Sequence, residues 1–338
     1  MTIRIAIIGA GLMGADHARI IARDLPGAAV QVVCDASPAR AKAVADETGA
    51  AGITTDPIAT ITRADVDAVI IASPDATHAP LVLACIAARK PVLCEKPLSQ
   101  LSSECLAVME AEIATGRTWV QLGFMRRFDQ SYTEMKAALA DGSLGRALMM
   151  HNFHRNVATP AANFTGAMAI TNSAPHEFDV ARFVLDTDYT AISAFQPKRS
   201  DTLVAPVFMV LETTDGQIVN IEINNNAAYG YDVRGELVGE QGSVSLQSPS
   251  YLRRDAALTQ TELYATDWRP RYAAAYIRQN RAFLHFVQSG TPSPIASNAW
   301  DGTCAALVAE AGVRALGEGR KIPVQNVTKP AFYAKGTP

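Results

Sequence analysis

The feature that most constrains the fold is an apolar run followed at once by three closely spaced glycines. Residues 3–8 are almost entirely apolar, and Gly9, Gly11 and Gly14 come next. A short run rich in isoleucine predicts a buried strand, and a Gly-x-Gly-x-x-Gly spacing that opens a helix is typical of turns that bind a dinucleotide pyrophosphate. Glycines in a turn are more often turn residues alone, so this spacing needs a second signal.

A carboxylate at the end of the second predicted strand provides that signal. Asp35 follows the glycines by about twenty residues, where a carboxylate can accept hydrogen bonds from the adenosine ribose hydroxyls. It would repel a 2′-phosphate, and no Arg or Lys follows immediately in residues 36–38. We therefore expect NAD to be preferred over NADP. The alternative is that Asp35 only caps the next helix.

The pattern of predicted strands and helices changes at about residue 122. Before it, apolar runs alternate with Ala-rich helical stretches, which predicts a Rossmann domain over residues 1–122, an α/β fold with a doubly wound parallel sheet. Over residues 123–338, alternating strands and turn signals predict an α+β domain with an open, mostly antiparallel sheet for substrate binding and oligomerisation. The expected strands are 3–8, 30–34, 68–72, 91–94, 118–122, 207–213, 217–225 and 233–237, and the expected helices include 38–48, 79–89, 128–141 and 299–316.

The overall charge and the cysteines exclude several classes of partner. A net charge of -3 provides no broad positive field for a nucleic acid or an anionic membrane. The five cysteines lack zinc-site spacing, so we expect no metal and read them as reduced, mostly buried thiols. The chain opens directly on its first strand and has no apolar stretch long enough to span a bilayer, so we expect a cytoplasmic protein.

Polar residues follow two more predicted strands of the parallel sheet. Ser73-Pro74 and Glu95-Lys96-Pro97 come where strands end, at the edge at which open α/β sheets bind ligands. Lys96 by itself is equally well explained as a surface lysine paired with a carboxylate. Spacing gives His17 and His78 no partner, so we interpret both as helix-face or capping residues.

The early glycines, Glu95-Lys96-Pro97 and a later His176 together resemble the Gfo/Idh/MocA family of oxidoreductases over the full chain. Within that family the resemblance is to bacterial inositol 2-dehydrogenases. It is carried by five further segments, which are residues 123–128, 154–156, 229–232, 267–268 and 299–302.

The resemblance implies an NAD-dependent dehydrogenase that oxidises a secondary alcohol of a cyclic polyol and assembles as a homotetramer. In this interpretation Lys96 polarises the reacting hydroxyl and His176 accepts its proton. The implied cofactor site comprises Gly9, Gly11, Leu12, Met13, Gly14, Asp35, Ser73, Pro74, Glu95 and Lys96. The implied substrate site comprises Arg127, His154, Asn156, Asn172, His176, Tyr231 and Trp268.

One position departs from the pattern of the inositol enzymes, which carry an aspartate four residues before the histidine. Here that residue is Asn172, an uncharged amide that cannot favour an imidazolium electrostatically. Asp179, three residues after His176, could orient the histidine if this stretch is helical. The change leaves open a dehydrogenase acting on a pyranose sugar or glycoside. A protein that binds NAD(H) for regulation, without turnover, is the alternative of another class.

Overall fold

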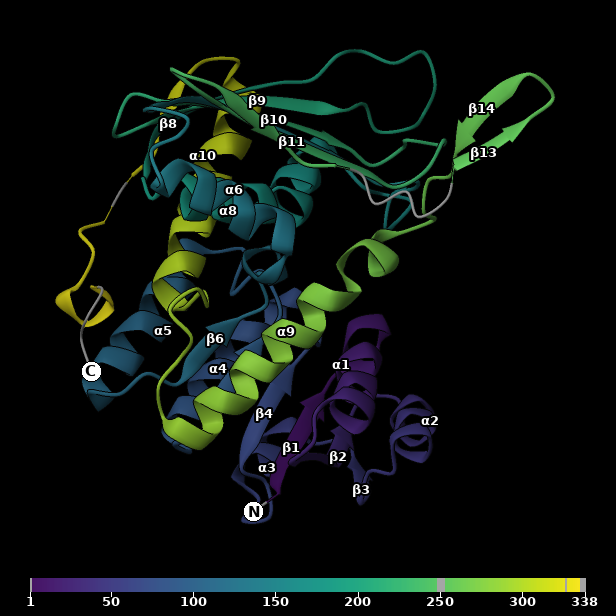
Figure 1. The fold of residues 1–338 in the computed structure, drawn as a ribbon. Coiled ribbons are helices and arrows are strands. Elements are labelled where there is room, and N and C mark those ends of the chain that lie inside the picture. The colour runs from purple at the N-terminus through teal and green to yellow at the C-terminus, as the bar shows by residue number, and fades with distance from the viewer. Residues whose placement is uncertain (1, 248–252, 326, 335–338) are drawn as a thin grey trace. The chain divides into compact units, whose positions relative to one another are not determined.

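The computed structural model describes residues 2–247, 253–325 and 327–334, which form two compact units (Figure 1). Unit 1 contains residues 2–128, 275–306 and 327–334, and unit 2 contains the described residues of 129–274 and 307–325. We predicted one change of domain near residue 122, whereas here two later segments return to unit 1. Helices α9 (Trp268–Ser289) and α10 (Ala299–Glu318) each begin in one unit and end in the other.

Unit 1 is built on a six-stranded parallel sheet of order β3-β2-β1-β4-β5-β6. The chain order reverses between β1 and β4, which is the switch point where doubly wound sheets bind ligands. The strands are β1 Ile3–Ile8, β2 Ala28–Cys34, β3 Gly52–Thr54, β4 Ala68–Ile71, β5 Val92–Cys94 and β6 Val120–Leu122. The helices between them are α1 Leu12–Asp24, α2 Pro38–Thr48, α3 Pro57–Thr62, α4 His78–Ala87 and α5 Ser102–Thr115.

Alternate side chains of this sheet enter two separate cores, because successive residues of a strand point to opposite faces. One core includes Ile5 and Leu93 and is completed by Phe283 and Phe286 of α9. The other is completed by the first turns of α10 and by Tyr333. Apolar cores therefore cover both faces of the sheet and hold the carboxyl ends of β1, β4 and β5 in place.

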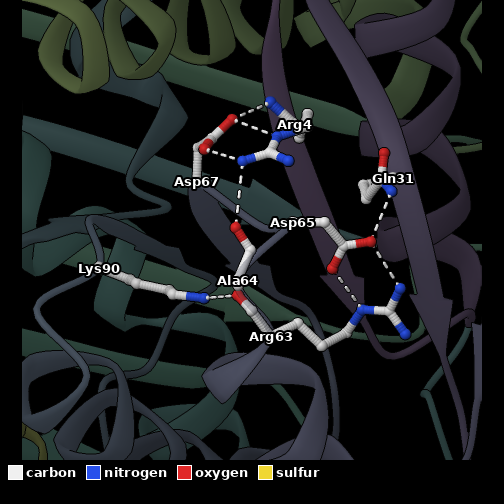
Figure 2. A network of polar contacts seen from close by, with 7 residues as sticks. All are labelled: Arg4, Gln31, Arg63, Ala64, Asp65, Asp67 and Lys90. Atoms are coloured by element: carbon white, nitrogen blue, oxygen red, sulfur yellow. Dashed lines mark hydrogen bonds and ion pairs between the residues drawn. The ribbon is translucent and has the colours of Figure 1, made fainter.

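A polar network joins the opposite, amino-terminal edge of the same sheet (Figure 2). Arg4 at the start of β1 donates through Nε and Nη2 to the two oxygens of Asp67, at 3.0 and 2.8 Å. Arg63 pairs in the same forked way with Asp65, which also accepts from Gln31 of β2. Hydrogen bonding by Arg4 holds the pKa of Asp67 below its usual range. The charges at this edge thus pair locally, away from the carboxyl ends of the strands.

The last described segment is fixed to unit 1 by a buried carboxylate. Glu112 of α5 accepts from the backbone N–H groups of Trp119 and Val120 and from the hydroxyl of Tyr333, at 2.6, 2.8 and 2.6 Å. Tyr333 lies in the 3-10 turn Ala331–Tyr333. Burial raises the pKa of Glu112 even though all three hydrogen bonds oppose that shift.

Unit 2 contains a seven-stranded sheet of order β12-β11-β7-β10-β9-β8-β15, in which only β7 and β10 pair in parallel. The predicted fold class, a parallel Rossmann sheet plus a mostly antiparallel second sheet, is confirmed. The strands are β7 Ala147–Arg155, β8 Tyr189–Phe195, β9 Val207–Thr213, β10 Ile218–Asn224, β11 Asp232–Gly239, β12 Ser243–Ser245 and β15 Ile322–Pro323, beside a separate hairpin of β13 Arg253–Ala256 and β14 Thr259–Glu262. The helices wholly within the unit are α6 Gln130–Ala140, α7 Gly166–Met168 and α8 Pro175–Leu185.

The two faces of the unit 2 sheet differ in polarity. On the inner face, Met150, Leu211 and Leu237 are buried, and α8 packs on β7 from that side. The registers place Phe153, Phe208 and Glu222 together on the outer face, where each is half-buried or exposed. His154 lies on the inner face, beside the buried apolar residues.

Several elements were not anticipated from the sequence. They are the edge strand β3, the hairpin β13–β14, the strands β8, β12 and β15, and the long helix α9. All five cysteines are buried thiols without a disulfide. Among the described helices, none combines the length and the apolar character that crossing a membrane would need.

Candidate functional site

The glycine turn at the end of β1 is a close contact between backbones. A Cβ on Gly9, whose φ is +95°, would lie 2.4 Å from the carbonyl oxygen of Ala72, and a Cβ on Gly14 would lie 1.8 Å from that of Gly9. A Cβ on Gly11 would instead point into space left open by the described residues. Helix α1 begins at Leu12 without a side-chain cap, so its first N–H groups can receive a phosphate.

Asp35, at the end of β2, is buried and held from both sides. Its Oδ2 accepts from the N–H of Ala10 and its Oδ1 from the N–H of Ser37, each at 2.8 Å. Arg40 of α2 donates to the same Oδ1 at 2.9 Å. Burial alone would raise the pKa of Asp35, but these hydrogen bonds together lower it. The carboxylate is therefore ionised beside the glycine turn, as a ribose ligand needs to be.

His78, the first residue of α4, connects the two loops that follow β4 and β5. Its Nε2 lies 2.8 Å from the carbonyl oxygen of Ser73, and its Nδ1 lies 2.7 Å from that of Pro97. The hydroxyl of Ser73 also contacts that of Thr77 at 2.6 Å. His78 thus sets the spacing between the Ser73-Pro74 turn and the loop that carries Lys96.

In the Glu95-Lys96-Pro97 loop, Glu95 is a buried residue and Lys96 a half-buried one. Glu95 Oε1 lies 2.9 Å from Nε2 of His17, on helix α1. Burial lowers the pKa of Lys96, with a smaller contribution from Arg126, whereas the charges of Glu95 and Asp75 raise it. We interpreted His17 and His78 as helix-face or capping residues, and both do lie on helices. Each also has two polar partners that spacing in the sequence did not indicate.

Arg127, which we expected in the substrate site, is in the 3-10 turn Met125–Phe128 of unit 1. Its Nη2 lies 2.9 Å from Oδ1 of Asp301, in the first turn of α10. The pair is largely buried, so the guanidinium is held in one direction.

Three of the expected substrate residues in unit 2 lie around a fourth, His154, at the end of β7. They are Asn156, His176 and Tyr231. The ring centroid of His154 lies 6.4 Å from that of His176 and 6.1 Å from that of Tyr231. His154 Nδ1 lies 3.1 Å from a carboxylate oxygen of Glu177, and Nε2 lies 3.3 Å from the amide nitrogen of Asn156. A carboxylate accepts and an amide nitrogen donates, so this arrangement suits the tautomer of His154 with its proton on Nδ1.

His176 and two further expected residues of unit 2 lie at the start of a helix or in the turn just before it. His176 lies in the first turn of α8, directly after Pro175, and Asp179 is buried one turn later on the same helix. Asn172 is half-buried in the preceding π-turn, Ala169–Ser173. Trp268 is half-buried at the start of α9.

Several residues of these sites escaped the sequence analysis. They are Arg40, His17, Asn280, Glu177 and Asn225, the last of which accepts from Asn156 at 2.7 Å. Only Glu177, next to His176, and Arg40, one helical turn after Asp35, could have been found from their positions in the sequence. The others are brought in by the fold.

Two segments of the chain match models of one protein family. Residues 3–124 match the model of the GFO/IDH/MocA oxidoreductase family, NAD-binding Rossmann fold, and residues 132–245 match the GFO/IDH/MocA C-terminal domain. The expected resemblance is thereby confirmed, and so is NAD as the cofactor.

Individual relatives match over nearly the whole chain. Inositol 2-dehydrogenase 2 of Saccharopolyspora erythraea is 46% identical over 99% of this chain and 99% of its own length. Inositol 2-dehydrogenase of Burkholderia ambifaria is 39% identical over 98% of this chain and 99% of its own. The crystal structure of myo-inositol dehydrogenase from Lactobacillus casei in complex with NAD(H) and myo-inositol matches with a TM-score of 0.93 and 28% identity, over 98% of this chain and 100% of that one.

The geometry of Asp35 and Arg40 predicts cofactor preference. We expect catalytic efficiency with NAD to exceed that with NADP at least about tenfold, ~1.4 kcal/mol, because Asp35 repels a 2′-phosphate. Asp35→Ala should narrow the gap, since it also releases Arg40 to face the phosphate. Steady-state kinetics with both cofactors measure this.

The double variant Asp35→Ala/Arg40→Ala is the matched control, and it should use NADP less well than Asp35→Ala alone. Equal use of both cofactors by the unaltered protein would show that Asp35 does not face the ribose.

Proposed function

Since the chain belongs to the Gfo/Idh/MocA family of oxidoreductases, we propose that it oxidises one secondary hydroxyl of myo-inositol, or of a closely related cyclic polyol, to the ketone. The protein is an NAD-dependent dehydrogenase acting on CH–OH groups. The observation that carries the proposal is the full-length match to inositol 2-dehydrogenases, together with a polar cluster around His154 that offers several groups to hydroxyls.

The glycine turn, the uncapped start of α1 and Asp35 fit the pyrophosphate and ribose of NAD. When bound, NAD supplies the acceptor for the hydride that leaves the carbinol carbon. In our proposal Leu12, Met13, Ser73 and Pro74 complete the walls of that site.

In our proposal Lys96 donates a hydrogen bond to the reacting hydroxyl oxygen and stabilises the negative charge that develops there. His176 takes the hydroxyl proton. It lies in the first turn of α8, and histidine titrates near neutrality, as a base for this step needs to.

The substrate's other hydroxyls are bound, in the same proposal, by Arg127, His154, Asn156, Asn172 and Tyr231, with Trp268 against an apolar ring face. His154 Nε2 already accepts from the amide of Asn156, and its Nδ1 faces a carboxylate oxygen of Glu177, so it acts first by fixing its neighbours. The amides of Asn156 and Asn172 each offer a donor and an acceptor.

We also propose that the protein forms a homotetramer through the outer face of the unit 2 sheet. That face carries Phe208 and Phe153 beside the ion pair between Arg155 and Glu222, a mixture typical of subunit interfaces. The five thiols suit a reducing compartment, so we propose a cytoplasmic location.

Light scattering tests the assembly. We expect a mass of four 36.0 kDa chains, and we expect Phe208→Glu to lower it, because a charge on the outer face opposes its burial. Ile58→Glu, at an exposed position of α3 in unit 1, is the control and should keep the mass unchanged. A monomer in the unaltered protein would contradict the proposal.

The role of Lys96 predicts a separation of binding from chemistry. Lys96→Ala should lower kcat for myo-inositol oxidation about a hundredfold or more, while the Kd for NADH changes little, because the ammonium acts on the reacting oxygen. Lys42→Ala, an exposed lysine of α2 paired with Asp46, is the control and should keep full activity. Near-normal turnover in Lys96→Ala would exclude the proposed role.

Asn172 gives a prediction about pH and specificity. Asn172→Asp adds a carboxylate that favours an imidazolium at His176. The acidic limb of the pH profile for oxidation, on which activity decreases as pH falls, should therefore move to higher pH. Asn172→Ala removes the amide without adding charge and should leave that limb in place.

A panel of inositols and pyranose sugars should rank differently for Asn172→Asp, since an amide donates and accepts whereas a carboxylate only accepts. If a pyranose is the best substrate of the unaltered protein, the sugar dehydrogenase alternative replaces inositol. Identical profiles and rankings for the two forms would place Asn172 outside the reaction centre.

A further inference from the structure

A buried polar chain runs behind the loop that carries Lys96, entirely within unit 1. His17 of α1 is 1% exposed and lies between Glu95 and Asn280 of α9. Its Nε2 is 2.9 Å from Oε1 of Glu95, and its Nδ1 is 3.0 Å from Oδ1 of Asn280. Helix α9 is thus linked to the carboxylate of Glu95 through His17 of α1.

The hydrogen bonds among Glu95, His17 and Asn280 determine where the ring protons of His17 lie. Asn280 donates through Nδ2 to the carbonyl oxygen of Tyr276 at 2.8 Å, which turns its Oδ1 toward His17. An amide oxygen only accepts, so Nδ1 of His17 carries a proton. The other ring nitrogen faces a carboxylate oxygen, so His17 and Glu95 share one further proton.

Glu95 is also confined on its other sides. Its Oε2 accepts from the backbone N–H of Lys96 at 3.3 Å. A Cβ on Gly123 would lie 2.9 Å from Cδ of Glu95, so the next strand approaches the carboxylate as closely as glycine allows. The carboxylate is therefore held in one place beside Lys96.

We propose that His17 is a positioning residue for Lys96: by sharing a proton with Glu95 it keeps that carboxylate fixed and polar next to the ammonium that acts on the substrate. The proposal rests on the proposed role of Lys96. Stability gives little reason for such a pair, because apolar residues of similar volume often replace a buried ion pair at no cost. A role in holding the ammonium accounts for it.

The groups around Lys96 determine the sign of the effect on pH dependence. Burial and the charge of Arg126 lower the pKa of Lys96, and the charges of Glu95 and Asp75 raise it. Without His17, the buried carboxylate of Glu95 loses the donor that holds its Oε1, which weakens the support that its charge gives to the ammonium of Lys96. The pKa of Lys96 then falls further. As pH rises, the activity that needs the ammonium is therefore lost at a lower pH than in the unaltered protein.

The experiment compares kcat–pH profiles of the full-length protein and its variants with NAD and myo-inositol. His17→Phe should lower kcat at least about tenfold and move the alkaline limb to lower pH, with the KM for NAD little changed. Glu95→Gln should move the limb in the same direction. His17→Gln should restore part of both, because its amide can still donate to Glu95.

A double variant distinguishes action through Glu95 from a general structural effect. His17→Phe added to Glu95→Gln should cost little more than Glu95→Gln alone, since contacting residues of one network are not additive. Tyr333→Phe is the matched control, because it also removes the side-chain partner of a buried carboxylate in unit 1. It should leave the alkaline limb in place.

An unchanged limb in His17→Phe, or additive losses in the double variant, would overturn the proposal. If His17→Phe does not fold, His17→Gln and Glu95→Gln provide the same comparison, and unshifted limbs in both overturn it. Lys96→Ala separates the two hypotheses. Full turnover in that variant removes the proposed function itself, whereas its inactivity together with an unshifted His17→Phe profile removes only the inference.

Discussion

The close approach of backbones at the end of β1 is the constraint on which unit 1 depends. With Gly9 against Ala72 and Gly14 against Gly9, the turn, the first helix and the end of β4 pack without side chains between them. That contact directs α1 back over the sheet, which brings His17 to Glu95. It also leaves the N–H of Ala10 facing Asp35. The glycine turn, Asp35 and the loop that carries Lys96 therefore share one support.

Much of this arrangement could be predicted because its signals are local. The strand-glycine-helix spacing and the alternation of apolar runs with helical stretches act over a few residues or one βαβ unit, and they predicted the fold class correctly. The contact of His17 with Glu95 joins residues 78 positions apart and could not be inferred from spacing. Arg40 was missed for another reason: one turn of α2 returns it to Asp35, beyond the three residues in which we looked for a positive charge.

The second unit was harder to predict in detail because its polar groups depend on sheet register. His154 faces inward with Met150, whereas Phe153 faces outward, and a shift of one residue would exchange them. Its partner Glu177 is fixed by the start of α8. Residue type alone indicated a polar wall, and only the register shows which side chains belong to it.

Helices α9 and α10 give unit 1 a core that the N-terminal half of the chain cannot complete. Phe283 and Phe286 fill one face of the sheet, and Ala299 to Ala306 together with Tyr333 fill the other. During synthesis, the strands of the parallel sheet leave the ribosome well before the side chains of α9 and α10 that cover them. Domains usually fold in the order in which they are made. Here the parallel sheet cannot finish folding until α9 and α10 have followed it, so its apolar faces stay open to chaperones, or to aggregation, while the intervening residues are made.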